Sequence, residues 1–364
     1  MVRTLLINLG SDAKGGRAQL SDLLEAGLRS IEGEALDVMQ LSGGAARVST
    51  AGRLAGRIDG ITNAVERSLI DRLSINPPDR VVIDGSNLGR LARIVKRSRP
   101  TLPIITFYHN VEARFFFDSL RAAPSLQSTG VLVANTLAEY WATYHSDRRV
   151  MLNLRDSRLL SRLYRRAGTD LLPMALRDQY DPAAARAASP FDGRYALFVG
   201  GAFYANVEGI AWYARNVAAR APFPTVLIGR GLEAHRERLE RWGGIHVIGA
   251  VEDLAPWYAH ARIVVAPIFS GSGMKTKTAE AFMHGKAIAG TTEAFVGYRG
   301  GSYQKQMTCN TPEAFLKALH VADRASSAFD PSLRMHYEQR HSEAAMRTGL
   351  SRILSRTVSG LATA

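Results

Sequence analysis

The residues of this chain that are best suited to chemistry lie in one stretch, GSGMKTKTAEAFMHGKA, at positions 271–287. The stretch combines glycines, a Lys-Thr pair and a helical continuation, as nucleotide-binding loops do. An ATP-binding loop of the GxxxxGK[ST] type needs its lysine directly after the last glycine. Here Met274 separates Gly273 from Lys275, so the stretch is not that motif and its residues must be considered one by one.

The Ser-Gly-Ser-Gly loop at positions 270–273 leads into a helical pattern that begins near Lys275. A helix amino terminus offers unpaired N–H groups and a partial positive charge, which suit an anion. Lysines there oppose the helix dipole, and three of the seven lysines of the chain lie between residues 275 and 286. We therefore predict a phosphate site. The alternative is a solvated helix face with a Lys277–Glu280 pair.

Glu280 lies one to two helical turns beyond this phosphate-facing end, among small and apolar residues. A carboxylate in that position can accept two hydrogen bonds from the vicinal hydroxyls of a ribose. Taken alone, a glutamate on a helix is most often a surface residue. Next to this loop, we predict that it binds ribose.

Short apolar runs alternate with longer amphipathic stretches, a pattern that predicts βα units around parallel sheets. In the first half we predict strands at 4–9, 81–84, 104–108 and 131–134, and helices at 18–30, 54–73 and 88–97. In the second half we predict strands at 195–199, 225–228, 245–248, 263–266 and 286–289, and a last helix at 331–358. Residues 171–194 contain three prolines and read as a linker.

The predicted organisation is therefore two Rossmann-like, doubly wound α/β domains that face each other across a cleft. The first domain covers residues 1–172, a linker covers 173–193, and the second domain covers 194–340. Residues 341–364 form a C-terminal helix that we expect to pack back on the first domain. In the second domain the strands end in glycines or small polar residues, where open α/β sheets bind their ligands.

The composition narrows the function further. The chain has 364 residues, a single cysteine and a net charge of +13, which argues against a disulfide framework and favours a cytoplasmic protein. The positive charge could indicate a nucleic-acid-binding protein, but it is spread evenly, with +7 in residues 1–170 and +6 in the remainder. No stretch approaches the length of a membrane-spanning helix, and attachment to an anionic membrane surface stays open.

Several segments of the chain resemble those of a known protein family. GSGMKTKTAEAFMHGKAIAGTTEAFVGY resembles the donor-site signature of family-4-like glycosyltransferases with the GT-B fold, of the bacterial surface-polysaccharide type. Similar segments follow in the expected order at 199–213, 226–231 and 251–268. In the first half, FYHNVEARFF at 107–116 resembles the His-Asn-Val-Glu segment of that family, and a glycine pair follows the first strand.

The resemblance implies a hexosyltransferase that uses a nucleoside-diphosphate sugar as co-substrate, without a metal or other cofactor. It implies retention of anomeric configuration and a glycan or lipid-linked glycan acceptor. The catalytic residues would be His109, Lys275 and Glu280. The donor-binding residues would be Gly15, Gly16, Gly200, Gly201, Asn206, Arg230, Val251, Leu254, Gly271, Ser272, Gly273, Met274, Lys275, Lys277 and Glu280.

The sequence also departs from the family. Many members carry a glutamate at the position of Ser272, so the backbone N–H groups of Gly273 and Met274 would have to take over sugar recognition. Many also carry an arginine and a lysine where this chain has residues 204–208. The diphosphate charge would then fall to Lys275, with Arg230 and Lys277.

An arginine series at 148–166 has leucines and a tyrosine interleaved. Such a helix can lie on an anionic membrane or approach a lipid diphosphate, and it is equally an ordinary helix with a solvated face. Two other functions stay open: a sugar-nucleotide epimerase of the same fold, and a basic nucleic-acid-binding protein. For the favoured transferase we expect a cytoplasmic protein, with peripheral attachment at the inner face of the membrane as the alternative.

Overall fold

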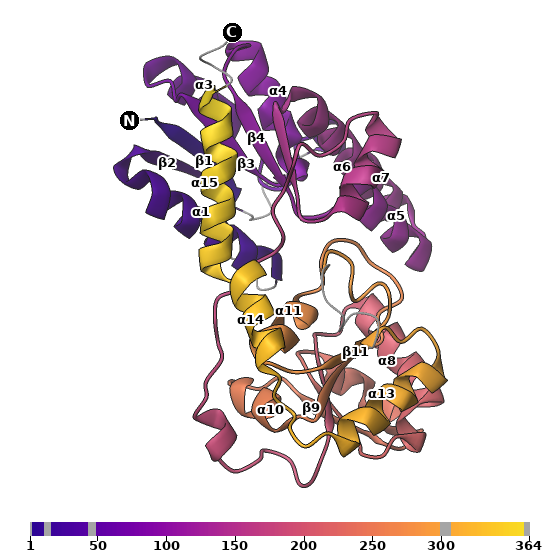
Figure 1. Cartoon of the computed structure of the whole chain (residues 1–364). Coiled ribbons are helices and arrows are strands. Elements are labelled where there is room, and N and C mark those ends of the chain that lie inside the picture. The colour runs from indigo at the N-terminus through magenta and orange to yellow at the C-terminus, as the bar shows by residue number, and fades with distance from the viewer. Residues whose placement is uncertain (1, 11–15, 43–48, 299–306, 360–364) are drawn as a thin grey trace. The chain divides into compact units, whose positions relative to one another are not determined.

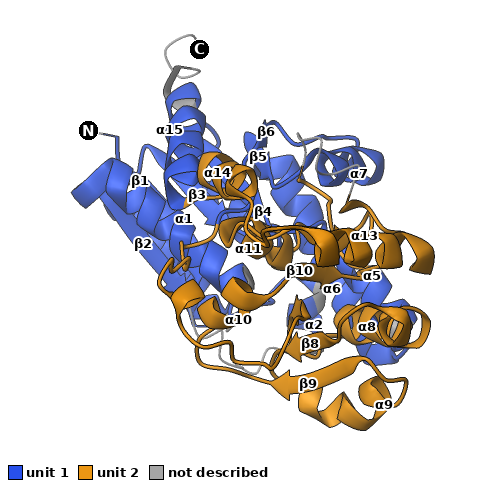
Figure 2. Ribbon diagram, turned by 60° about the horizontal axis from the view of Figure 1, so that its bottom comes forward, with its two compact units in different colours: residues 1–175, 343–364 blue, residues 176–342 orange. Residues whose placement is uncertain are grey.

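The computed structural model describes residues 2–10, 16–42, 49–298 and 307–359 (Figure 1). The chain forms two compact units. Unit 1 contains residues 1–175 and 343–364, and unit 2 contains residues 176–342 (Figure 2). Within the described residues, no helix has the length and apolarity that crossing a membrane requires.

Unit 1 is built on a parallel sheet with the strand order β2-β1-β3-β4-β5-β6. Its strands are β1 Thr4–Leu9, β2 Leu36–Leu41, β3 Arg80–Asp84, β4 Ile104–Tyr108, β5 Arg148–Met151 and β6 Asp170–Leu171. Its helices are α1 Gly16–Glu32, α2 Thr50–Leu54, α3 Asn63–Ile75, α4 Gly89–Ser98, α5 Glu112–Ala122, α6 Leu126–His145, α7 Leu154–Tyr164 and α15 Glu343–Ser359.

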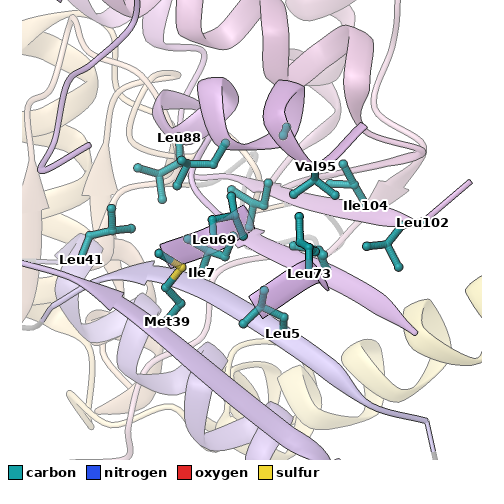
Figure 3. Packing of buried hydrophobic residues seen from close by; sticks show 14 of the residues in the cluster. Leu5, Ile7, Met39, Leu41, Leu69, Leu73, Leu88, Val95, Leu102 and Ile104 are labelled. Atoms are coloured by element: carbon teal, nitrogen blue, oxygen red, sulfur yellow. The ribbon is translucent and has the colours of Figure 1, made fainter. Parts of the chain in front are cut away.

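The central strands of this sheet are buried on both faces, as β-branched and leucine-rich runs in a parallel sheet must be. On one face, side chains of β1, β2 and β4 pack against α3 and α4 (Figure 3). Leu5, Ile7, Leu69 and Val95 are almost completely excluded from solvent there. This core fixes the sheet whose carboxyl edge carries the candidate residues of unit 1.

Unit 2 repeats the architecture with the strand order β11-β10-β7-β8-β9, all parallel. Its strands are β7 Ala196–Val199, β8 Thr225–Ile228, β9 Ile245–Gly249, β10 Ile263–Ala266 and β11 Ile288–Gly290. Its helices are α8 Tyr204–Asn216, α9 Arg236–Glu240, α10 Ala255–His260, α11 Thr276–Met283, α13 Pro312–Arg324 and α14 Pro331–Arg340. The strands predicted at 225–228 and 263–266 are confirmed to the residue.

The strand predicted at 131–134 is wrong. These residues lie inside α6, which begins after Ser125 with a reciprocal capping box to Ser128. A short apolar run does not distinguish a strand from a segment of buried helix, and the cap decides for the helix. The strand that fills this place in the sheet is β5, which begins in the arginine series at Arg148.

The helix predicted at 54–73 is interrupted. The short helix α2 ends at Leu54, and α3 begins at Asn63 behind an N-cap at Thr62. Between them Gly56, Asp59 and Gly60 have positive φ angles, which a helix cannot contain. The pattern of apolar residues continued across this turn, so periodicity alone did not reveal it.

The helix predicted at 331–358 is also divided. The chain leaves the helical path at His341, so that α14 belongs to unit 2 and α15 to unit 1. Within unit 1, α15 packs on α1, and the buried Arg80 at the start of β3 donates to the carbonyl of Leu354 at 3.0 Å. Arg80 also forms a buried ion pair with Glu32, the last residue of α1, and so links both α1 and α15 to the sheet.

Candidate functional site

The carboxyl edge of the sheet in unit 2 brings several predicted residues together. The register pairs Val199 with Ile228, so the glycines after β7 and β8 lie side by side. A Cβ on Gly229 would lie 2.1 Å from the carbonyl oxygen of Gly200, and one on Gly200 would lie 3.2 Å from Nζ of Lys277. Only glycine fits at position 229, because the backbone of Gly200 already occupies the space, whereas a side chain at position 200 would displace the heads of Asn206 and Lys277.

Lys277 lies at the centre of this cluster. Its side chain is buried, and its Nζ donates to Oδ1 of Asn206 at 2.9 Å. Asn206 in turn donates to the carbonyl of Gly201 at 2.8 Å. Burial lowers the pKa of Lys277 to about 8, opposed by Glu280 and assisted by Lys275. The alternative of a solvated helix face is therefore wrong for Lys277.

Arg230 follows β8 between two glycines, and its carbonyl accepts from the N–H of Ala202 at 3.0 Å. Its side chain is exposed. Among the residues that the structure describes, it forms no ion pair. Arg230 and Lys277 are therefore two cations at one sheet edge, one exposed and one buried.

Lys275 has a different environment from Lys277. Its Nζ forms an ion pair with Glu293 at 2.8 Å and donates to the carbonyls of Ser272 and Gly273, each at 3.2 Å. The residue is the N-cap of α11. Lys275 thus folds the glycine loop back on the helix start, and Glu293, which sequence reasoning did not single out, holds it there.

Glu280 lies on α11 and accepts from the hydroxyl of Tyr258 at 3.0 Å. Burial raises the pKa of Glu280, against the Tyr258 hydrogen bond and Lys277, which both lower it. The Tyr258 ring stacks on His284 with 4.3 Å between ring centroids. Tyr258 comes from α10, which directly follows the loop carrying the predicted residues Val251 and Leu254.

In unit 1, His109 follows β4 and is buried, and its Nε2 lies 2.6 Å from Oδ1 of Asp84 at the end of β3. The register pairs Asp84 with Phe107 and so brings the two side chains together. Burial acts to raise the pKa of Asp84, but His109 outweighs it and the pKa lies below its ordinary value. Nδ1 of His109 is buried and has no hydrogen-bond partner in the described part of the chain.

Two buried glutamates lie beside each other in the same unit, and one of them, Glu112, lies near His109. Glu139 on α6 accepts from the backbone N–H groups of Glu112 and Ala113, at 2.7 and 3.2 Å, and from the hydroxyl of Tyr164 at 2.9 Å. It therefore satisfies the amino terminus of α5. Burial, and then the charge of Glu112, raise the pKa of Glu139 to about 7. Burial raises the pKa of Glu112 as well.

The remaining predicted residue of unit 1 is the glycine pair. Gly16 is the first residue of α1, and Gly15 lies outside the described residues. The next residue, Arg17, donates to Oδ1 of Asn87 at 2.7 Å, and Asn87 also bonds Asp59. Asp84 could have been found from the sequence, since it ends a predicted strand as His109 does. Arg17 and Asn87 gave no such signal.

No group of three or more His, Cys, Asp or Glu side chains within the described ranges is arranged to hold a metal ion.

The predicted residues of unit 2 fall into three groups according to their contacts. Gly200, Gly201, Asn206, Arg230 and Lys277 form one. The loop Gly271, Ser272, Gly273 and Met274 with Lys275 forms the second, and Glu280 beside Tyr258 the third.

Known proteins of similar fold share this architecture over their whole length. HepE from Anabaena, solved in complex with UDP, matches with a TM-score of 0.65 at 12% identity, over 98% of this chain and 100% of that chain. The lipopolysaccharide outer core galactosyltransferase WaaB matches with a TM-score of 0.61 at 11% identity, over 98% and 100%. A trehalose 6-phosphate synthase from Burkholderia multivorans matches with 0.62 at 12%, over 100% of both chains.

A comparison with curated protein sequences gives no match. A family model, however, matches residues 193–320. That model and the two-sheet architecture define the class: the chain is an enzyme, a glycosyltransferase with the GT-B fold. Within the class, residues 193–320, which make up most of unit 2, are similar to the glycosyl transferases of group 1.

Proposed function

We propose that this enzyme transfers a hexose from a nucleoside-diphosphate donor to a glycan or lipid-linked glycan acceptor. Transfer proceeds with retention of anomeric configuration and without a bound metal. The observation that carries the proposal is the cationic edge of unit 2, where Lys277 and Arg230 lie beside the closely packed glycines that follow β7 and β8. The UDP complex of HepE, which has the same fold, supports a uridine nucleotide as the donor carrier.

The buried Lys277 is the stronger candidate for the diphosphate. A buried ammonium group costs free energy unless an anion accompanies it. Its hydrogen-bond partner Asn206 supplies only a neutral oxygen, and the nearby carboxyl of Glu280, whose pKa is itself raised by burial, offsets the cost only in part. A bound diphosphate would supply the missing charge. Lys275 already has Glu293 as a counter-ion, so we assign it to shaping the loop whose amides face the donor.

Different residues of unit 2 are assigned to the ribose and to the sugar of the donor. Glu280 is held in place by Tyr258 and offers carboxylate oxygens for the ribose hydroxyls. The N–H groups of Gly273 and Met274 are assigned to the sugar, since Ser272 replaces the glutamate of many relatives. Val251 and Leu254 are assigned to the base side of the donor.

The chemical step follows from charge. The bond between the anomeric carbon and the diphosphate oxygen breaks, and negative charge develops on the departing diphosphate. Preorganised cations and N–H dipoles lower the barrier by stabilising this charge. The acceptor oxygen then bonds the anomeric carbon on the same face, and its proton passes to the departing phosphate. No protein nucleophile is required.

On the acceptor side we assign His109 to contact with the transferred sugar. Asp84 fixes its ring through Nε2, and the buried Nδ1 has no hydrogen-bond partner in the described part of the chain. Asp84 is therefore a positioning residue. A polysaccharide or lipopolysaccharide acceptor, reached from the cytoplasmic face of a membrane, agrees with the galactosyltransferase WaaB among the proteins of similar fold.

The test is isothermal titration with UDP and with a single-stranded oligonucleotide, followed by a panel of nucleotide sugars scored for donor hydrolysis. We expect UDP to bind and one nucleotide sugar to be hydrolysed preferentially. Oligonucleotide binding without UDP binding would overturn the proposal in favour of a nucleic-acid-binding protein. Conversion of a nucleotide sugar into its epimer, without transfer to any acceptor, would overturn it in favour of an epimerase.

A further inference from the structure

His109 lies on a short connection between β4 and α5, and the helix α6 contacts both ends of this connection. The strand β4 ends at Tyr108 and α5 begins at Glu112, so residues 109–111 alone join them. The hydrogen bond to Asp84 fixes the side chain of His109. The position of its backbone therefore depends on what anchors Tyr108 on one side and Glu112 on the other.

The helix α5 begins without a polar residue at its N-cap position. Val111 occupies that position and makes no side-chain hydrogen bond there, although serine, threonine, aspartate or asparagine usually supplies an acceptor. Glu139 of α6 takes this role, because one of its oxygens accepts from the N–H of Glu112 at 2.7 Å and the other from that of Ala113 at 3.2 Å. A carboxylate suits this place, since the helix dipole favours negative charge at the amino terminus.

The other end of the connection is anchored one turn further along α6. The Thr143 hydroxyl donates to the backbone carbonyl of Glu139 at 2.7 Å, so its only proton is already used. The Tyr108 hydroxyl, 3.1 Å from the Thr143 oxygen, must therefore be the donor in that bond. Both side chains are almost completely excluded from solvent. The helix α6 thus bonds the residue before the 109–111 connection and the residue after it.

The carboxyl group of Glu139 is itself held in place. It is completely buried, and it accepts from the hydroxyl of Tyr164 at the end of α7, at 2.9 Å. A longer hydrogen bond of 3.4 Å joins it to Ser86, which lies two residues after Asp84. The same carboxyl group therefore contacts the chain after β3 as well as the chain after β4.

Close backbone packing fixes the place of α6 relative to the chain after β3. A Cβ on Gly89, the first residue of α4, would lie 1.9 Å from the carbonyl oxygen of Ala138 and 2.5 Å from the backbone nitrogen of Ala142. Backbones in such contact leave α6 little room to shift. Glu139, next to Ala138, therefore presents its carboxyl group from a fixed position.

We propose that Glu139 is a positioning residue for the transfer reaction. It fixes the start of α5 and, through the three-residue connection, the position from which His109 reaches Asp84. This role rests on the proposed function, in which His109 contacts the transferred sugar. A residue that only capped α5 would stabilise the fold and leave kcat unchanged, so kinetics can distinguish the two roles.

The test compares Glu139→Gln with Asn135→Ala in the full chain. Glutamine has the size of glutamate, but its NH₂ group cannot accept from the second N–H of α5. Asn135 is also a buried polar residue of α6, and it donates to the carbonyl of Val131 in the same helix. Its loss should therefore not reach His109. Steady-state kinetics gives kcat and the donor KM, calorimetry gives UDP affinity, and melting temperatures report on folding.

We expect Glu139→Gln to lower kcat by about tenfold to a hundredfold, because a small displacement of a group at the reacting centre is costly. UDP affinity and the donor KM should stay unchanged, and Asn135→Ala should keep the kcat of the unmodified enzyme. Unchanged kcat in Glu139→Gln, an equal loss of kcat in both variants, or a fall in UDP affinity would overturn the proposal.

Should Glu139→Gln not fold, Tyr164→Phe gives the same test. It removes one of the hydrogen bonds that hold the Glu139 carboxyl group and leaves the start of α5 untouched. We expect kcat to fall by about threefold, in keeping with the loss of one hydrogen bond, and UDP affinity to stay unchanged. A kcat equal to that of the unmodified enzyme would overturn the proposal.

A double variant shows whether Glu139 acts through His109. Glu139→Gln and Asp84→Asn displace the same ring, so together they should lower kcat by no more than the larger single loss. Losses that multiply would mean that Glu139 acts independently of His109, and would overturn the proposal. Absence of transfer by the unmodified enzyme with every donor would overturn the proposed function itself, whereas normal kcat in Glu139→Gln would overturn only the role of Glu139.

Discussion

The carboxyl edges of the two parallel sheets have the same geometry and opposite chemistry. In unit 2 the edge carries Lys277 and Arg230 around paired glycines. In unit 1 the corresponding edge carries Asp84, Glu112 and His109. A doubly wound fold therefore sets where a ligand can bind, while the side chains after each strand decide which charge it can have.

Burial acts on both edges, and it disfavours the charged form in each. It lowers the pKa of Lys277 in unit 2 and raises the pKa of Glu112 and Glu139 in unit 1. A ligand that restores the missing charge is therefore bound more strongly than it would be on an exposed surface. By this reasoning unit 2 suits an anion, whereas the buried carboxyl groups of unit 1 do not.

The largest expected effect comes from the cationic edge. Lys277→Ala should lower kcat/KM for transfer by about a hundredfold to a thousandfold, because the developing charge on the diphosphate loses a buried cation. Steady-state kinetics with the preferred donor measures this. Lys317→Ala, at an exposed lysine of α13 in the same unit, is the control and should leave the rate unchanged. Near-normal turnover of Lys277→Ala would mean that the diphosphate lies elsewhere.

The Lys275–Glu293 pair separates shaping the loop from binding the donor. Lys275→Ala should reduce transfer by about a hundredfold, and Glu293→Gln by about tenfold, because the loop then loses one of its anchors. Donor titrations and kinetics on both variants measure this. If Glu293→Gln were as active as the unmodified enzyme while Lys275→Ala was inactive, Lys275 would contact the donor directly and not through the loop.

The unit 1 edge should respond in a different kinetic parameter. Asp84→Asn should reduce kcat by about tenfold to a hundredfold, since His109 loses the carboxylate that orients it, while UDP affinity stays unchanged. Rapid-quench kinetics and calorimetry give the two numbers. Asp71→Asn, at an exposed position of α3, is the matched control. A fall in UDP affinity for Asp84→Asn would contradict the division of roles between the edges.

The donor affinity should depend on pH through Lys277. Its pKa of about 8 means that the ammonium form predominates below that pH and is lost above it. UDP affinity should therefore fall as pH rises through 8, approaching tenfold per pH unit. Lys277→Arg, whose side chain stays protonated, should remove the dependence. An identical pH profile in that variant would assign the titration to another group.

The smallest expected effect concerns the ribose. Glu280→Ala should weaken donor binding by about tenfold, corresponding to one charge-assisted hydrogen bond. Tyr258→Phe should weaken it less, because the carboxylate remains and only its positioning bond is lost. Glu237→Ala, on α9 and exposed, serves as the control. Calorimetry with a ribonucleotide and its 2′-deoxy analogue shows whether the hydroxyls are the contact.

The sequence by itself determined the succession of elements. Most strands, the glycines that end them and the start of α11 were predicted because apolar alternation, turn residues and helix caps act over a few neighbouring positions. Where a local pattern was ambiguous, prediction failed. Residues 131–134 are apolar in a helix as well as in a strand, and only the cap at Ser125 distinguishes the two.

Only the tertiary structure decided which side chains meet. Asp84 contacts His109 because β3 and β4 are neighbours in register, and Lys277 contacts Asn206 although 71 residues separate them. Strand order and burial depend on packing among distant segments, and no local spacing encodes them. The sequence therefore specified a loop suited to phosphate, whereas packing decided that Lys277 is the buried cation and that Lys275 pairs with Glu293.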